Sequence, residues 1–418
     1  MELFIIITLL VIVSAIYSYL NARFIKLPGT IGVVSIAIGV SVVTIIIDRL
    51  SPGAAHYLTS LSKNINFTST VLNIMLGFLL FAGAFNLNNR KLKKEMVPVL
   101  ILSTFGVVLS AAIFGALFYG ATILFHVQVP LIYCFLFGAL VSPTDPVAVG
   151  AVIKGSKLPQ NLETIISGES LFNDGVGLVL FITILEFTES GTDHVDFAKT
   201  ATLFVREVFG GIALGITAGF IAYHLMKSIT DFQTIVLVSL GLVMGISVLA
   251  ADLHVSIPLA AVSAGLFAGN RSINQDSSEH SHQGLEKFWQ LIDEMLNTIL
   301  FVMIGLQMVN LPYIDNYWLT GGIAILAILI ARWLSIMLPL TFLRRSLNVN
   351  YSSINILTWA GLRGGISIAL ALALPITPYK HTILSGSYFI VIFSIIVQGL
   401  TLNKVINASF KDKEIANP

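Results

Sequence analysis

The chain has 418 residues, of which 56% are hydrophobic and only 11% are charged, and its mean hydropathy is +0.89. Soluble globular proteins carry about 25% charged residues, so a water-soluble fold could not bury this much apolar surface. The formal net charge of +1 gives no field that would attract nucleic acid. Cys134 is the single cysteine, which excludes an intrachain disulfide framework and a cysteine metal cluster. We therefore expect an all-α, multi-pass membrane protein in contact with lipid.

Thirteen apolar segments are candidates for transmembrane helices, each of which needs about 20 mostly apolar residues. The first segment opens with Glu2 and has no basic residues before it, which favours a first transmembrane helix over a cleaved signal peptide. The predicted spans cover roughly residues 3–20, 31–47, 69–88, 97–125, 131–153, 161–187, 203–226, 233–252, 255–269, 286–309, 317–343, 352–374 and 381–405.

The basic residues predict the orientation of these spans. Sixteen of the 23 Lys and Arg residues fall in the C-terminal tail and in loops after odd-numbered spans, five fall on the opposite side, and Arg332 and Arg363 lie within spans. The positive-inside rule then places the N-terminus outside and the C-terminus in the cytoplasm. We expect one transmembrane unit over residues 1–418, with a short cytoplasmic tail at 406–418.

Asp145 lies in the middle of the fifth span, between Pro143 and Pro146. Each proline removes a backbone donor and disturbs the preceding turn, so we expect the helix to break here and to leave bare carbonyl groups. Broken backbone at membrane depth is tolerated where it is buried in protein or lines a water-filled cavity. These carbonyls, the Thr144 hydroxyl and the Asp145 carboxylate are hard oxygen donors, which suit a small hard cation.

The sixth span carries two polar pairs at helical spacing. Ser170 and Asp174 are four residues apart and share one face, whereas Glu169 and Asn173 share a neighbouring face. The second pair could engage a cation such as arginine. Because spans 5 and 6 are consecutive, we expect the carboxylates of Asp145 and Asp174 to meet near the middle of the membrane. Buried ionisable groups of this kind usually mark ion or proton pathways.

The twelfth predicted span, 352–374, contains Arg363 with Gly361, Gly364 and Gly365 around it. This pattern indicates a loosened helix and close backbone approach. Span 12 comes seven spans after span 5, so the two occupy matching positions in two halves of the chain. Interrupted helices at matching positions of two halves are typical of inverted-repeat transporters. We therefore expect repeats formed by spans 1–6 and 8–13, with broken helices 5 and 12 crossing at the site.

Three long motifs resemble those of the NhaP/NHE-type sodium/proton antiporters, within the monovalent cation:proton antiporters. They occur in the order of that family, and a weaker match lies between the second and third motifs, in residues 288–307. The motifs are Ser142-Pro-Thr-Asp-Pro-Val-Ala-Val149, Ser167-Gly-Glu-Ser-Leu-Phe-Asn-Asp174 and Leu357-Thr-Trp-Ala-Gly-Leu-Arg-Gly364.

The resemblance implies a role for each residue of the motifs. Asp174 would bind either the cation or the proton, with Asp145, Thr144 and Ser170 completing a shell for Na⁺ or Li⁺. Glu169, Asn173 and Arg363 would form a buried network that holds the site in shape.

The resemblance also implies a mode of transport. The Asn173-Asp174 pair is associated with electroneutral, one-for-one exchange within the superfamily. Cation and proton would compete for Asp174 and Asp145 during alternating access. A K⁺/H⁺ antiporter of the same fold is the alternative.

Further expectations concern assembly and setting. The resemblance implies a core domain, which we assign to spans 3–6 and 10–13, and a dimerisation domain from the remaining spans, in a homodimer. We expect sodium transport and pH homeostasis in a bacterial plasma (inner) membrane, with no cofactor, no enzymatic chemistry and no nucleic-acid partner. A channel is disfavoured because it would not need two broken helices. An intramembrane serine hydrolase is disfavoured because it would need a histidine base near mid-membrane, and the sequence has no histidine there.

One position departs from the family pattern. Relatives carry an acid in the third span after Leu-Phe, where this chain has Ala82 in the run Leu79–Gly83. The loss of this carboxylate bears on cation selectivity and on the ion path.

Overall fold

The computed structural model is all-helical in the part of the chain that it describes. The described part covers residues 2–415 apart from 52–65, 126, 128, 146–148, 151–152, 154–155, 157, 191–196, 270–278, 310–316 and 343–351.

Ten helices or helical runs in the described residues are long and apolar enough to cross a membrane. Four of these runs contain a π-helical turn, which adds one residue to the helix locally. The ten are α1 (Glu2–Leu20) with η1 (Asn21–Ile25), α2 (Gly29–Leu50), α4 (Phe67–Ser69) with η2 (Thr70–Met75) and α5 (Leu76–Asn86), α7 (Met96–Ile101) with η3 (Leu102–Gly106) and α8 (Val107–Leu124), α11 (Gln160–Ser190), α12 (Phe197–Lys227), α13 (Phe232–Leu253), α15 (Glu279–Met308), α16 (Tyr317–Phe342), and α20 (Lys380–Ile392) with η5 (Phe393–Gln398) and α21 (Gly399–Ile415).

The other three predicted spans are short or interrupted. Span 5 begins with α9 (Leu131–Val141), span 9 is α14 (Ile257–Gly269), and span 12 is divided into α18 (Ser352–Trp359) and α19 (Gly365–Ala373). None of these helices reaches the roughly 20 residues that cross a bilayer. The predicted all-α fold with interruptions in spans 5 and 12 is therefore confirmed, whereas the division into repeats stays a prediction.

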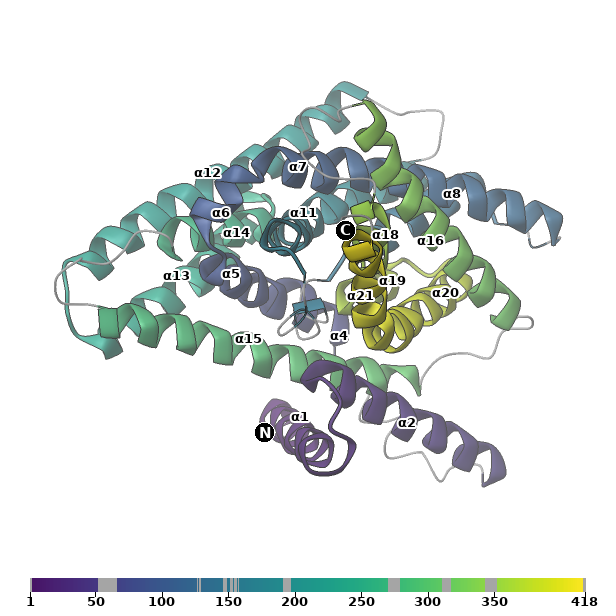
Figure 1. The fold of residues 1–418 in the computed structure, drawn as a ribbon, viewed down its shortest axis with the longest axis horizontal. Helices are drawn as coiled ribbons and strands as arrows, with labels where there is room; N and C mark the ends of the chain where they lie inside the picture. The colour runs from purple at the N-terminus through teal and green to yellow at the C-terminus, as the bar shows by residue number, and fades with distance from the viewer. Residues whose placement is uncertain are drawn as a thin grey trace.

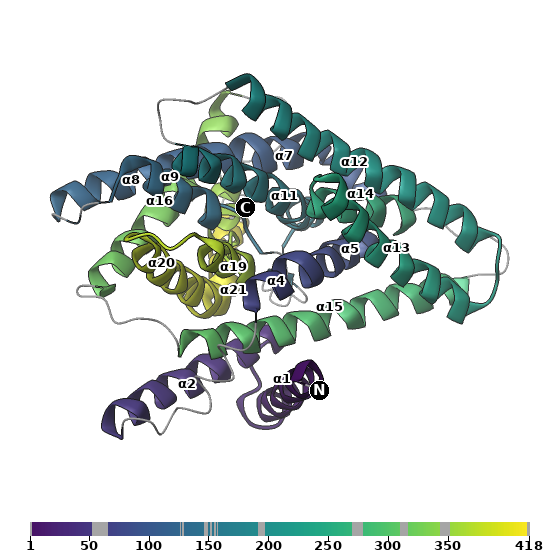
Figure 2. The ribbon, with the colours of Figure 1, turned by 180° about the vertical axis from the view of Figure 1, so that it is seen from behind.

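The site helix α11 lies near the middle of the molecule. Figure 1 shows it end-on, with α5, α12, α13 and α14 on one side and α16, α18, α19, α20 and α21 on the other. Figure 2 shows the same arrangement from behind, with α15 running beneath both groups and α1 and α2 on its far side. The broken helices α9 and α18–α19 therefore meet α11 at the centre of the bundle.

Two clusters of buried apolar side chains flank this centre. One surrounds the broken helices, where the Phe137 ring on α9 makes edge contacts with Phe114 and Phe118 at centroid distances of 4.9 and 5.1 Å. The other joins α5 and α12–α15 around Trp289, whose ring lies 4.6 Å from that of Phe81. Packing on both sides holds α11 and the broken helices in register.

Candidate functional site

The break in span 5 begins where α9 ends at Val141, and residues 142–145 are not helical. The backbone N–H of Asp145 donates a hydrogen bond of 2.8 Å to the carbonyl oxygen of Leu362, in the break of span 12. A donor freed by one broken helix therefore satisfies a carbonyl freed by the other, which is how interrupted backbone persists at membrane depth.

The break in span 12 covers residues 360–364, between α18 and α19, and all five are buried. Gly364 lies against Asp145 so closely that a Cβ atom added to it would stand 1.8 Å from Asp145 Oδ2. Glycine is required here because only a bare backbone permits this approach. The two interrupted segments thus cross in direct contact, as the sequence predicted.

The helix α11 presents its polar residues to this crossing. Glu169, Ser170, Asn173 and Asp174 are all buried. One turn beyond Asp174, a Cβ atom added to Gly177 would stand 2.1 Å from the Pro143 ring. The span 5 break therefore packs directly on α11.

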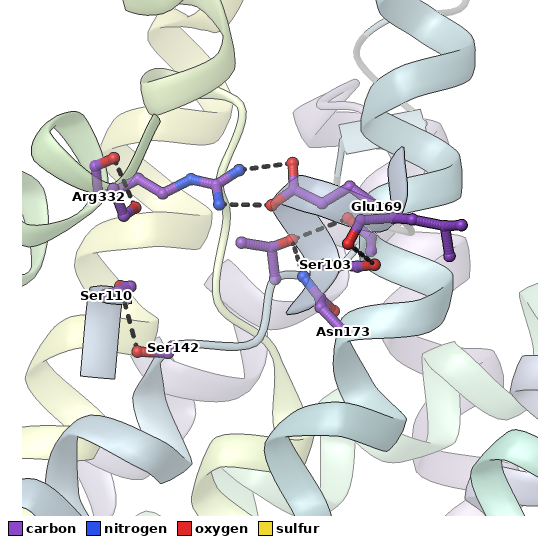
Figure 3. Close-up of polar contacts among 10 residues, drawn as sticks. Ser103, Ser110, Ser142, Glu169, Asn173 and Arg332 are labelled. Atoms are coloured by element: carbon purple, nitrogen blue, oxygen red, sulfur yellow. Dashed lines mark hydrogen bonds and ion pairs between the residues drawn. The ribbon is translucent and has the colours of Figure 1, made fainter. Parts of the chain in front are cut away.

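Hydroxyl and amide groups connect the span 5 break to α11. Thr144 Oγ1 lies 2.9 Å from Ser170 Oγ, and Asn173 Nδ2 donates to Thr144 Oγ1 at 2.7 Å. Figure 3 shows Asn173 of this group and the Ser142–Ser110 hydrogen bond of 3.1 Å, which ties the span 5 break to α8. Thr144 and Ser170, predicted to share a cation shell, thus lie within hydrogen-bonding distance of each other.

The two aspartates of the predicted site interact electrostatically across the crossing. Asp174 is repelled by Asp145 and attracted by the Arg363 guanidinium. Asp174 is buried, whereas Asp145 is partly exposed. Two carboxylates that repel each other favour the binding of a positive charge or a proton by one of them.

Glu169 forms a bidentate ion pair with Arg332 of α16, with Nη2 donating to Oε2 at 2.8 Å and Nη1 donating to Oε1. Both side chains are buried, and Figure 3 shows the two parallel bonds. The sequence placed Glu169 in a network with Asn173 and Arg363 and left Arg332 without a role. Both arginines lie within predicted spans, so the sequence alone does not decide which of the two pairs with Glu169.

Arg363 is fully buried between these groups. Its charge interacts with Glu169 and Asp174 and is repelled by Arg332. Among the described residues its Nε and Nη1 atoms have no hydrogen-bond partner. The charge of Arg363 therefore acts on the carboxylates of both Glu169 and Asp174.

Ala82, at the position where an acid was expected, is fully buried in α5. It belongs to the apolar cluster around Trp289. This position therefore contributes packing to the bundle and no carboxylate to the ion path.

Comparison with known proteins identifies the family. The family model described as "Sodium/hydrogen exchanger, transmembrane" matches residues 9–408. The chain belongs to the sodium/hydrogen exchanger family. The Na(+)/H(+) antiporter NhaP of Pseudomonas aeruginosa is 39% identical over 402 residues, which cover 94% of each chain. The Na(+)/H(+) antiporter NhaH of Halobacillus dabanensis is 30% identical over 92% of this chain and 93% of that one.

A solved structure supports the fold assignment. The sodium proton antiporter MjNhaP1 from Methanocaldococcus jannaschii superposes with a TM-score of 0.75 at 18% identity, covering 97% of this chain and 99% of that one. Members of the sodium/hydrogen exchanger family are secondary transporters that use no cofactor. Family membership therefore confirms that the chain is not an enzyme and that transported ions are its substrates.

Proposed function

We propose that this family member exchanges Na⁺ or Li⁺ for H⁺, with Asp174 and Asp145 binding either ion in turn. The observation that carries the proposal is the crossing of two broken helices at Asp145, whose carboxylate repels the buried carboxylate of Asp174. The exchange of sodium for protons is also what the relatives NhaP and NhaH are named for.

The oxygen donors around the carboxylates suit a dehydrated alkali cation. Thr144 Oγ1 and Ser170 Oγ bond to each other at 2.9 Å, so an arriving cation gains two hydroxyl ligands when that single bond opens. Such a neutral bond contributes only about 1 kcal/mol net, and the cost of opening it is small beside the gain of hard oxygen ligands.

The charges of the buried cluster favour one-for-one exchange. Asp145, Glu169 and Asp174 carry three negative charges when ionised, and the two neighbouring guanidiniums of Arg332 and Arg363 carry two positive charges. One monovalent cation or one proton neutralises the remainder. A neutral cluster crosses the low-dielectric interior far more readily than a charged one, so the site changes sides only when it carries a cation or a proton and not when it is empty.

Alternating access supplies the rest of the mechanism. We infer that a core domain carrying spans 3–6 and 10–13 moves against a dimerisation domain made of the other spans, within a homodimer. The N-terminus lies outside and the C-terminus in the cytoplasm of a bacterial inner membrane, where the exchange serves pH homeostasis. The basic loops after odd-numbered spans support this orientation.

The test is reconstitution into liposomes that contain a pH indicator. A pH gradient is set, and Na⁺, Li⁺ or K⁺ is added separately to wild-type protein and to Asp174→Asn. We expect Na⁺ and Li⁺ to dissipate the gradient in the wild type and Asp174→Asn to be silent, because the amide cannot bind and release a proton.

Two results would change the proposal. If only K⁺ dissipates the gradient, the protein is the K⁺/H⁺ antiporter, and Ala82 is the first position to examine. If no cation moves protons, or if Asp174→Asn transports at the wild-type rate, the site assignment is wrong.

A further inference from the structure

The last span contains a buried polar pair inside its π-helical turn. Ser394 is the second residue of η5 and Gln398 is its last, and each is 2% exposed. Ser394 Oγ donates to Gln398 Oε1 at 2.6 Å. This bond holds the Gln398 amide with its Nε2 group turned away from its own helix. π-helical turns occur frequently at functional sites because they redirect side chains in this way.

The Gln398 amide contacts the broken helix of span 12. Its Nε2 donates to the carbonyl oxygen of Trp359 at 3.4 Å. Trp359 is the last residue of α18, and the last four carbonyls of any helix lack partners within the helix. Gln398 therefore supplies a donor at the point where span 12 breaks.

A second contact fixes the same helix end. The indole Nε1 of Trp359 donates to Thr401 Oγ1 on α21 at 2.9 Å. The end of α18 is thus attached to the last span through both its backbone and its side chain. Only three residues further on, Leu362 accepts the hydrogen bond from Asp145.

We propose that Gln398 is a positioning residue of the cation site, acting through the end of α18. By holding the Trp359 carbonyl, Gln398 keeps Leu362 and Gly364 in place against Asp145. Gln398 itself touches neither aspartate and binds no ion. This role rests on the proposed function, since it assumes that Asp145 binds the transported cation.

Ser387 offers a matched control in the same span. It is fully buried, and its Oγ donates to the Ile383 carbonyl of its own helix at 2.7 Å. Gln398 and Ser387 are therefore both buried polar residues of the last span, but only Gln398 bonds across to span 12. A general loss of buried polarity would affect both variants alike.

The experiment measures the apparent KM for Na⁺ and the maximal rate in liposomes for Gln398→Leu, Gln398→Glu and Ser387→Ala. We expect Gln398→Leu to raise the KM about fivefold with a maximal rate within about twofold of wild type, because a displaced crossing weakens cation binding more than it slows movement. Ser387→Ala should leave both values within about 1.5-fold of wild type.

Gln398→Glu adds a pH readout that a packing role would not produce. A protonated glutamate can donate to the Trp359 carbonyl, whereas an ionised one cannot. The ratio of the variant KM to the wild-type KM should be near one at acidic pH and should rise with pH. If Gln398→Leu does not fold, Thr401→Val, which removes the second contact at nearly constant volume, should shift the KM in the same direction.

An unchanged KM in Gln398→Leu, or equal shifts in Gln398→Leu and Ser387→Ala, would overturn the positioning role. If Thr401→Val has to replace Gln398→Leu, an unchanged KM in Thr401→Val would likewise overturn the positioning role. Wild-type protein that moves no protons on cation addition would instead overturn the proposed function, so the two failures are distinguishable.

Discussion

The two broken helices are held in place by different kinds of contact. The break in span 5 is attached through neutral hydroxyl and amide groups, which join Ser142 to Ser110 and Thr144 to α11. Span 12 is attached on both sides of its break through longer side chains, one of which is charged. Gln398 meets the end of α18 at the break, and Lys380 donates to the carbonyls of Leu372 and Leu374 at the opposite, C-terminal end of α19.

The difference indicates which segment changes partners when an ion binds. Neutral hydrogen bonds contribute about 1 kcal/mol net, whereas bonds to charged groups contribute about 1.5–3 kcal/mol. We infer that Thr144 and its neighbours exchange their protein contacts for a cation, while the span 12 break remains a fixed support. Substitutions at the supports of span 12 should therefore displace the crossing or lower stability, whereas a substitution of Thr144 itself should act directly on ion binding.

The largest effect is expected for Arg332→Gln. It leaves the buried Glu169 carboxylate without its bidentate partner, and breaking a buried pair in this way costs about 3–5 kcal/mol. Thermal unfolding in detergent should show a lower Tm than for wild type. The double variant Glu169→Gln with Arg332→Gln should regain part of the loss, because no charge is then left unpaired. A double variant less stable than the single one would contradict this explanation.

Gly364→Ala should greatly slow transport while the protein still folds. The added Cβ would stand 1.8 Å from Asp145 Oδ2, so the two breaks must separate. We expect a loss of about a hundredfold in cation-driven proton flux, since misplacing a reactive group by about 1 Å can cost this much. Gly245→Ala on α13 is the matched control, because nothing lies within 4 Å of its added Cβ. Comparable flux in both variants would refute a close crossing.

Lys380→Met should lower stability by about 1–2 kcal/mol with little change in the KM for Na⁺. The substitution removes two donors and a positive charge from the end of α19, where a cation complements the helix dipole. Lys380→Arg keeps the charge and should retain most of the wild-type Tm. A Tm for Lys380→Met equal to that of the wild type would show that the last span does not support α19.

Ser110→Ala is expected to have the smallest effect. It removes the hydrogen bond to Ser142, and both residues are buried. The loss should be about 1 kcal/mol of stability, with a KM for Na⁺ changed by less than about twofold. A change in the KM for Na⁺ larger than that of Gln398→Leu would show that the span 5 break, and not the span 12 break, is the fixed support of the site.

The breaks could be predicted from the sequence because their causes are local. Pro143 and Pro146 remove donors, and the glycines around Arg363 remove side chains, so each interruption is encoded where it occurs. The partner of Glu169 could not be predicted, because Arg332 and Arg363 are both candidates and only the packing of α16 decides. The role of Gln398 depends on a π-helical turn, which has no sequence signature of its own.

The most direct test of one-for-one exchange is the balance point of the two gradients. Liposomes receive a fixed Na⁺ ratio, the proton ratio is varied, and the voltage is clamped with K⁺ and valinomycin at zero and at about 100 mV. We predict that net flux vanishes where the proton ratio equals the Na⁺ ratio, at either voltage. Exchange of two protons for one Na⁺ would move one net charge, worth about 2.3 kcal/mol at 100 mV. At the fixed Na⁺ ratio, this energy corresponds to a factor of roughly 50 shared between two protons, so the balancing proton ratio would shift by roughly sevenfold with voltage. Such a shift would contradict a site that needs only one positive charge.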